Sequence, residues 1–117
     1  EGFKVAFVAG TLGQGGAERQ LYYMLKTLTR AGARLKLYSL TRGEFWQQAI
    51  EELGVEVIWI GQKPSRFLRL LKLIEELRKD RPEVVQSQHF YTNIYVALAA
   101  HALGLRSIGA IRNDVKI

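Results

Sequence analysis

The sequence contains no cysteine, which excludes a disulfide framework and thiolate metal sites. It also lacks a long apolar run. The longest, residues 94–105, is interrupted by His101 and is shorter than the roughly 20 residues of a membrane-spanning helix. The first residues enter a strand pattern directly, so we expect no signal peptide. These absences fit a reducing compartment and a protein that meets a membrane, if at all, from its surface.

No tandem repeat, linker or low-complexity segment divides the chain, so we expect residues 1–117 to form a single domain. With 48% apolar and 24% charged residues, the composition is that of a soluble globular domain. The net charge of +6 is uneven: residues 1–62 hold 7 Lys/Arg against 6 Asp/Glu, and residues 63–117 hold 10 against 5. The basic residues lack the aromatic platform or motif of a nucleic-acid-binding module, so we expect no nucleic-acid partner.

Short apolar runs alternate with amphipathic segments along the whole chain. Residues 3–9 form a near-continuous apolar run that ends at a glycine, which is typical of a buried strand. In residues 17–31 apolar side chains recur at steps of three and four, as on one face of a helix, and Gly32 follows as a stop. Ser65 is placed to cap a later helix. The expected strands are residues 3–9, 33–40, 55–60, 83–88 and 106–111, and the expected helices are residues 17–31, 44–53, 65–79 and 91–103.

This alternation predicts an α/β fold, a Rossmann-like three-layer sandwich. Its parallel sheet should have five strands, or slightly more, with helices on both faces. In open parallel sheets, ligands bind beyond the carboxyl ends of the strands. Three segments are therefore the candidates for a functional site: residues 10–17, 87–93 and 112–114.

The stretch GTLGQGGAERQL places four glycines within seven residues, between the first expected strand and the first expected helix. Three interpretations compete: a bare tight turn, a dinucleotide phosphate loop, and the substrate loop of another nucleotide-related enzyme. A dinucleotide loop needs a small residue at the last position of G-x-G-x-x-G, where this chain has Glu18. It also needs an acidic residue near the end of the second strand, and residues 38–42 offer none. Arg42 could hold a 2′-phosphate, so an NAD(P)-binding half stays open. A Walker loop is excluded because no Gly-Lys-Ser/Thr follows.

Outside the dinucleotide interpretation, the stretch is a backbone loop that delivers N–H groups at the positive end of a helix. Such a place favours anions, phosphates and the hydroxyls of sugars. Glu18 in the first helical turn complements the helix dipole. A structural turn alone stays an alternative, although four glycines exceed what a turn requires.

Three segments together resemble the N-terminal domain of retaining GT-B glycosyltransferases: KVAFVAGTLGQGGAERQLYYMLKTL, LGVEVIWI and LRKDRPEVVQSQHFYTNIYVALAAHALGLRSIGAIRN. The most specific element is GGAER directly after the first strand, supported by the RPEVVQSQ strand and the small-residue helix behind it. The resemblance covers nearly the whole chain. Members of this group build polysaccharides, lipopolysaccharide and glycolipids.

The resemblance implies the acceptor-binding half of an enzyme in which two Rossmann-like domains face each other across a cleft. The glycine loop, Gly13, Gln14, Gly15 and Gly16, would lie at that cleft. A C-terminal domain missing from this chain would bind most of the nucleotide-sugar donor, a co-substrate, so the chain alone is not expected to transfer sugar. The resemblance further implies a sugar or lipid-linked acceptor, no metal and no cofactor, and a cytoplasmic location, peripheral on the inner face of a membrane. The alternative from another class is a non-catalytic α/β module that binds a phosphorylated ligand or a protein partner.

Polar residues after the fourth and fifth strands are further site candidates. His89 could donate a hydrogen bond to an acceptor hydroxyl or act as a base, with a half-exposed loop histidine as the alternative. Relatives often carry a histidine at the position of Arg112, where arginine could hold a phosphate or an acceptor carboxylate but cannot act as a base. Asp114 could accept a proton, so His89 and Asp114 are the catalytic candidates. The expected substrate-binding residues are Gly13, Gln14, Gly15, Gly16, Glu18, His89, Tyr91, Asn93, Arg112 and Asn113.

The run KPSRFLRLLKL places Arg66, Arg69 and Lys72 three residues apart, with apolar residues between them and no acid before Glu75. On a helix these cations share a stripe that could lie on anionic lipid. We therefore expect a membrane-surface contact there, with an ordinary solvated helix face as the alternative.

Overall fold

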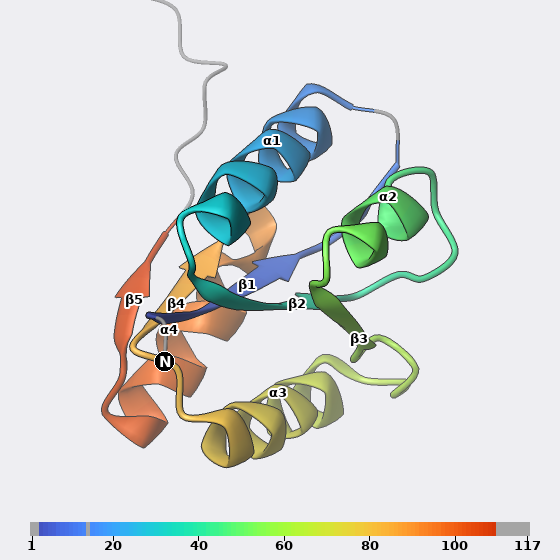
Figure 1. The fold of residues 1–117 in the computed structure, drawn as a ribbon. Coiled ribbons are helices and arrows are strands. Elements are labelled where there is room, and N and C mark those ends of the chain that lie inside the picture. Colours follow the sequence, from blue (N-terminus) through green and yellow to red (C-terminus); the bar gives the residue numbers. More distant parts are fainter. Residues whose placement is uncertain (1–2, 14, 110–117) are drawn as a thin grey trace, which may run out of the picture.

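The computed structural model of the chain describes residues 3–13 and 15–109 (Figure 1). Strands and helices alternate in the order that the sequence predicts. The strands are β1 (Lys4–Ala9), β2 (Arg34–Ser39), β3 (Glu56–Trp59), β4 (Val84–Ser87) and β5 (Arg106–Ile108). The helices are α1 (Gly16–Arg30), α2 (Gln47–Glu52), α3 (Arg66–Asp80), the 3-10 helix η1 (Phe90–Thr92) and α4 (Asn93–Leu103).

The five strands are parallel and form one sheet in the order β3-β2-β1-β4-β5. Strand β1 lies in the middle, where Val5 pairs with Leu35 of β2 on one side and with Val84 of β4 on the other. Helices α1 and α2 cover one face of the sheet, and α3 and α4 cover the other (Figure 1). The predicted three-layer, Rossmann-like fold is therefore confirmed.

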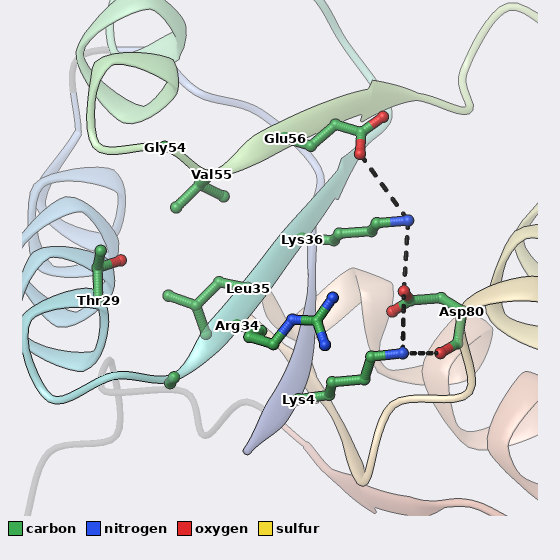
Figure 2. A pocket seen from close by; sticks show the side chains of 10 residues that line it. Lys4, Thr29, Arg34, Leu35, Lys36, Gly54, Val55, Glu56 and Asp80 are labelled. Atoms are coloured by element: carbon green, nitrogen blue, oxygen red, sulfur yellow. Dashed lines mark hydrogen bonds and ion pairs between the residues drawn. The ribbon is translucent and has the colours of Figure 1, made fainter. Parts of the chain in front are cut away.

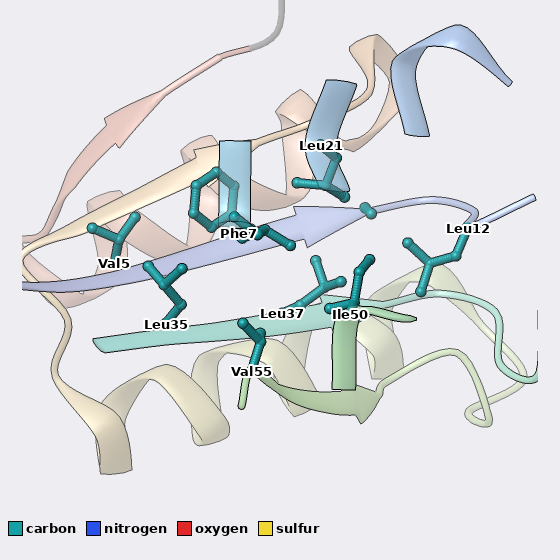
Figure 3. Close-up of a cluster of buried hydrophobic side chains, with 10 residues drawn as sticks. Val5, Phe7, Leu12, Leu21, Leu35, Leu37, Ile50 and Val55 are labelled. Atoms are coloured by element: carbon teal, nitrogen blue, oxygen red, sulfur yellow. The ribbon is translucent and has the colours of Figure 1, made fainter. Parts of the chain in front are cut away.

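Each face of the sheet has its own hydrophobic cluster. Under α1 and α2, the cluster includes Phe7 of β1, Leu21 of α1 and Leu37 of β2, whose side chains are fully buried (Figure 3). Each buried leucine contributes about 1.5–3 kcal/mol before entropy is counted, so the apolar stripe of α1 is enough to dock the helix. Under α3 and α4 the buried side chains include Val8, Tyr38, Leu73, Leu77 and Val96.

The ends of α3 and α4 follow the capping chemistry that the sequence indicates. Ser65 Oγ accepts a hydrogen bond from the Leu68 amide at 3.1 Å, which confirms the predicted cap. Helix α4 ends at Gly104, whose φ of 70° is left-handed and therefore suits glycine. No helix in the described part of the chain is long and apolar enough to cross a membrane.

Two helices begin later than the sequence predicts. The helix expected over residues 44–53 covers only Gln47–Glu52, because Glu44 and Trp46 bind the loop after β1 instead. The Trp46 amide donates to the Leu12 carbonyl at 2.9 Å. The helix expected from residue 91 starts as the 3-10 turn η1, and α4 begins at Asn93.

Candidate functional site

The loops that follow β1, β2 and β4 meet at the carboxyl-end edge of the sheet. The described residues of the loop after β1, residues 10–13 and 15, contain three of the four glycines, and the fourth, Gly16, begins α1. We call the whole segment from Gly10 to Gly16 the glycine loop. On one flank its Gly10 amide donates to His89 Nδ1 from the loop after β4, at 3.0 Å. On the other flank its Leu12 amide donates to Glu44 Oε1 from the loop after β2, at 2.8 Å. The glycine loop is therefore held from both sides.

His89 and Glu18 form a pair that sequence analysis did not connect. His89 Nε2 lies 2.9 Å from Glu18 Oε2, and the two side chains are only 10% and 8% exposed. Because Nδ1 accepts the Gly10 N–H, the ring proton lies on Nε2 and is donated to the Glu18 carboxylate. Both ring nitrogens are thus engaged within the protein, so His89 ties the loop after β4 to the start of α1.

Two glycines of the loop make room for neighbouring side chains. The Tyr91 ring occupies the space that a side chain at Gly10 would need, and it stacks on His89 with ring centroids 5.5 Å apart. The Glu18 carboxylate occupies the corresponding space at Gly15. Burial, together with the negative charges of Glu18 and Glu44, raises the pKa of the Tyr91 hydroxyl above its usual value. A side chain at Gly10 would therefore displace the Tyr91 ring, and one at Gly15 would displace the Glu18 carboxylate.

Glu44 holds the loops after β1 and β2 together through a single oxygen. Its Oε1 accepts hydrogen bonds from Thr11 Oγ1 at 2.6 Å, from Thr41 Oγ1 at 2.7 Å and from the Leu12 amide at 2.8 Å. The Thr11 hydroxyl, followed by the Thr41 hydroxyl and the Leu12 amide, lowers the pKa of the Glu44 carboxyl. The apolar spacing predicts a helix that includes Glu44, and this part of the prediction is wrong. The signal for a different role is that Glu44 is the only acid in residues 40–46.

A hollow of about 460 Å³ opens beside the glycine loop, between the start of α1 and the residues before α2. Glycines form part of its lining, and aromatic side chains and one cation form the rest. The aromatic side chains and the cation could not be assigned to a site from the sequence, because a helical pattern does not show which side chains face a hollow. The lining residues are Gly15, Gly16, Arg19, Tyr23, Phe45 and Trp46.

Of the other predicted site residues, some lie at the carboxyl-end edge of the sheet and some lie outside the described residues. Gly13 lies in the loop, where its amide donates to Thr11 Oγ1 at 3.1 Å. Asn93 begins α4, and its side chain lies beside Gly109, just past β5. The remaining candidates, Gln14, Arg112, Asn113 and Asp114, lie outside the described residues.

The three cations of the expected membrane stripe lie on α3, where Arg66 and Arg69 line a hollow together with Tyr91. Arg69 Nε donates to the Lys63 carbonyl at 2.9 Å, and Lys72 Nζ lies 3.1 Å from Glu76 Oε2. Two of the three charges therefore already have partners. Arg66 lies next to Phe67, whose side chain is 65% exposed.

A separate cavity of about 320 Å³ lies at the opposite edge of the sheet, where the strands begin (Figure 2). Four of its five charged residues form ion pairs: Asp80 lies 3.3 Å from Lys36 and 3.8 Å from Lys4, and Lys36 lies 3.8 Å from Glu56. The fifth, Arg34, has no ion pair within the described part of the chain. Since ligands of open parallel sheets bind at the carboxyl ends of the strands, we place the candidate site at the glycine loop. Within residues 3–13 and 15–109, no cluster of three potential metal-binding side chains occurs.

Comparisons with known proteins fit this architecture. The model of the family described as Glycosyltransferase Family 4 matches residues 14–112 of the chain. Among curated proteins, none matches the chain significantly in sequence.

Several solved structures share the fold. They include HepE from Anabaena in complex with UDP, at 14% identity and a TM-score of 0.75, and a glycosyltransferase from Rickettsia africae, at 12% and 0.77. MurG from Acinetobacter baumannii matches at 16% and 0.69. The matches cover 92%, 100% and 92% of this chain, but only 29%, 31% and 34% of the respective proteins. The chain therefore spans about a third of the length of these proteins.

Proposed function

Because the chain belongs to the family described as Glycosyltransferase Family 4, we propose that it is the acceptor-binding half of a sugar-transferring enzyme. The enzyme would transfer a sugar from a nucleotide-sugar donor to a sugar or lipid-linked acceptor. The observation that carries this proposal is the glycine loop, held on both flanks at the carboxyl-end edge of the sheet. HepE, which shares the fold, was solved with UDP and with UDP-glucose, and this supports a nucleotide-sugar donor.

In this proposal the described residues bind and orient the acceptor rather than exchange protons with it. Glu18 and His89 are positioning residues, because each binds the other and His89 also fixes the Gly10 amide. Gly16, the first residue of α1, has open space where a side chain would lie, so an acceptor can approach the backbone there. A second domain would supply the other wall of the cleft and most of the donor contacts.

Titration of the ¹⁵N-labelled chain with NADP and with UDP-glucose tests the proposed use of the glycine loop. We expect NADP to leave the amide resonances of residues 10–13 unchanged, because the Glu18 carboxylate fills the space beside Gly15 that a pyrophosphate bound along the loop would occupy. UDP-glucose should cause weak shifts at most, since the other domain would bind the donor. Saturable NADP binding at the loop would contradict the proposal and favour an NAD(P)-binding half.

The continuation of the gene separates the transferase from a non-catalytic module that binds a phosphorylated ligand or a protein. The proposal predicts that codons after residue 117 encode a second α/β domain with an E-x7-E acidic motif. A stop codon at that point would favour the module.

We also propose that the start of α3 contacts an anionic membrane. Phe67 and Leu71, one helical turn apart, are exposed, and Arg66 lines a surface hollow together with Phe67. A cation beside apolar side chains suits a lipid surface. Arg66→Glu should lower the fraction of protein that co-sediments with phosphatidylglycerol vesicles several-fold, since each cation near such a surface contributes about 1 kcal/mol. Arg78→Glu makes the same charge change in the last turn of α3 and should have a smaller effect. Equal binding of the two variants and the unmodified chain would contradict the proposal.

A further inference from the structure

Exposed aromatic side chains form part of the lining of the hollow beside the glycine loop. Phe45 is 60% exposed and Tyr23 is 54% exposed, and both line the same hollow of about 460 Å³. That volume falls within the range of roughly 300–1,000 Å³ that is usual for small-molecule sites. Exposed aromatic side chains that cluster around one hollow indicate a ligand-binding surface.

The aromatic wall is already held in place without a ligand. The Phe45 ring meets the Trp46 ring edge-on at 5.2 Å, and Trp46 stacks on Tyr22 at 5.0 Å. Tyr22 in turn meets Tyr23 edge-on at 5.3 Å. The wall is joined to the glycine loop through the Trp46 amide, which donates to the Leu12 carbonyl at 2.9 Å. A ligand would therefore find a preorganised surface, which reduces the entropy lost on binding.

The hollow is lined by one cation and no acid. Arg19 is its single charged lining residue, and the Arg19 side chain forms no ion pair or hydrogen bond within the described part of the chain. Its backbone amide donates to the Gly15 carbonyl at 3.1 Å in the first turn of α1. The two nearby acids are committed elsewhere, because Glu18 binds His89 and Glu44 accepts three hydrogen bonds. A free guanidinium beside aromatic faces favours an anionic group attached to a partly apolar ring.

We propose that this hollow binds a sugar carrying a phosphate. The C–H face of the sugar ring packs on the aromatic wall, and the phosphate binds the Arg19 guanidinium with two parallel hydrogen bonds. The inference rests on the proposed function and names its acceptor class: the sugar phosphate is the group that receives the transferred sugar. A free sugar phosphate and a lipid-linked one share this chemistry.

The test is a titration of the ¹⁵N-labelled chain, followed by backbone amides and by the Trp46 indole resonance. The probes are the 1-phosphates of glucose, galactose and N-acetylglucosamine, with the same neutral sugars and inorganic phosphate as references. We expect at least one sugar phosphate to shift Trp46 and Arg19 and to bind about tenfold more tightly than its neutral sugar or inorganic phosphate, which corresponds to about 1.4 kcal/mol. Equal affinity for inorganic phosphate and the sugar phosphates shows anion binding only and overturns the inference, as does a lack of binding by all three.

Two variants measure separately the phosphate contact of Arg19 and the contact of the sugar ring with Phe45. Arg19→Ala should reduce affinity for the sugar phosphate about tenfold and leave the weak binding of neutral sugar unchanged, whereas Phe45→Ala should weaken both. Arg78→Ala and Phe67→Ala are the matched controls, since each removes an exposed side chain of the same type from α3, and neither should change binding. Loss of binding in a control equal to that in its partner variant overturns the inference.

A decyl phosphodiester of the sugar whose 1-phosphate binds most tightly distinguishes a lipid-linked sugar phosphate from a free one. Tighter binding than the monoester identifies a lipid-linked acceptor, and equal or weaker binding identifies a free one; both support a sugar-phosphate site. The proposed function and this inference can fail separately. A second α/β domain in the gene together with no sugar-phosphate binding at Trp46 overturns the inference alone. Binding at Trp46 with a stop codon after residue 117 overturns the transferase alone.

Discussion

Replacing Gly61 by alanine is expected to destabilise the chain by about 2–4 kcal/mol, a large part of the roughly 5–15 kcal/mol that holds a domain folded. A Cβ at Gly61 would collide with the backbone carbonyl of Leu40 and would lie 3.0 Å from the Leu40 Cα. Backbone atoms cannot move aside as a flexible side chain can. The same carbonyl accepts the Trp59 indole N–H at 3.2 Å, so displacing it also breaks that hydrogen bond.

Urea denaturation followed by circular dichroism measures this effect, and Gly16→Ala is the control. No heavy atom lies within 4 Å of a Cβ built at Gly16, and the residue opens α1, where alanine is a good helix former. The control should therefore unfold at the urea concentration of the unmodified chain or slightly above it. Similar midpoints for the Gly61 and Gly16 variants would show that the loops after β2 and β3 are not in the close contact described.

Replacing Glu44 by alanine should have the second largest effect, a loss of about 1–3 kcal/mol, because three donors lose a charged acceptor. The loops after β1 and β2 would also lose their connection, so the aromatic wall should loosen as stability falls. Chemical denaturation at neutral pH measures the loss of stability, and the Trp46 indole N–H resonance of the ¹⁵N-labelled chain is the local probe of the aromatic wall. Glu52→Gln is the control, since exposed Glu52 accepts one hydrogen bond, from Gln48 Nε2 at 3.3 Å, and contacts neither loop.

The Glu44 carboxyl also predicts a pH dependence with a definite sign. Its pKa is lowered in the folded chain, mainly by the Thr11 hydroxyl, and returns to the usual glutamate value on unfolding. Its contribution is therefore complete above the usual glutamate pKa of about 4.3, and it is lost as the pH falls through the lower, folded pKa. Glu44→Gln should show a weaker dependence of unfolding free energy on pH in this acidic range. Identical pH profiles for the variant and the unmodified chain would contradict the assignment.

The sequence predicts the elements of this fold better than the contacts of its site. Apolar periodicity and capping residues indicate the order of strands and helices, since each signal is local, as at Ser65. The Glu18–His89 pair is different, because the two residues are 71 positions apart and meet only when β4 lies beside β1. Strand order is set by how helices pack on the two faces, and periodicity along a single strand does not encode it.

Glu44 and Phe45 show the same limit at shorter range. Their spacing is compatible with a helix, and propensity favours one, but hydrogen bonds to Thr11, Leu12 and Thr41 hold the segment out of helical geometry. Tertiary hydrogen bonds from 32 and 33 residues away thus override a local preference. The arginine and aromatic residues of the hollow were visible in the sequence, but only the folded chain brings them together.

The residues that hold the glycine loop in place differ from the residues that line the hollow beside it. His89 and Glu44 fix the path of the backbone, whereas Arg19, Tyr23 and Phe45 project from that path without supporting it. If the proposed sugar-phosphate site is correct, exchanging these three side chains should change the ligand that binds while the main chain stays in place. A designer who wishes to redirect the domain to a different partner molecule can randomise those three positions and leave the two attachments untouched.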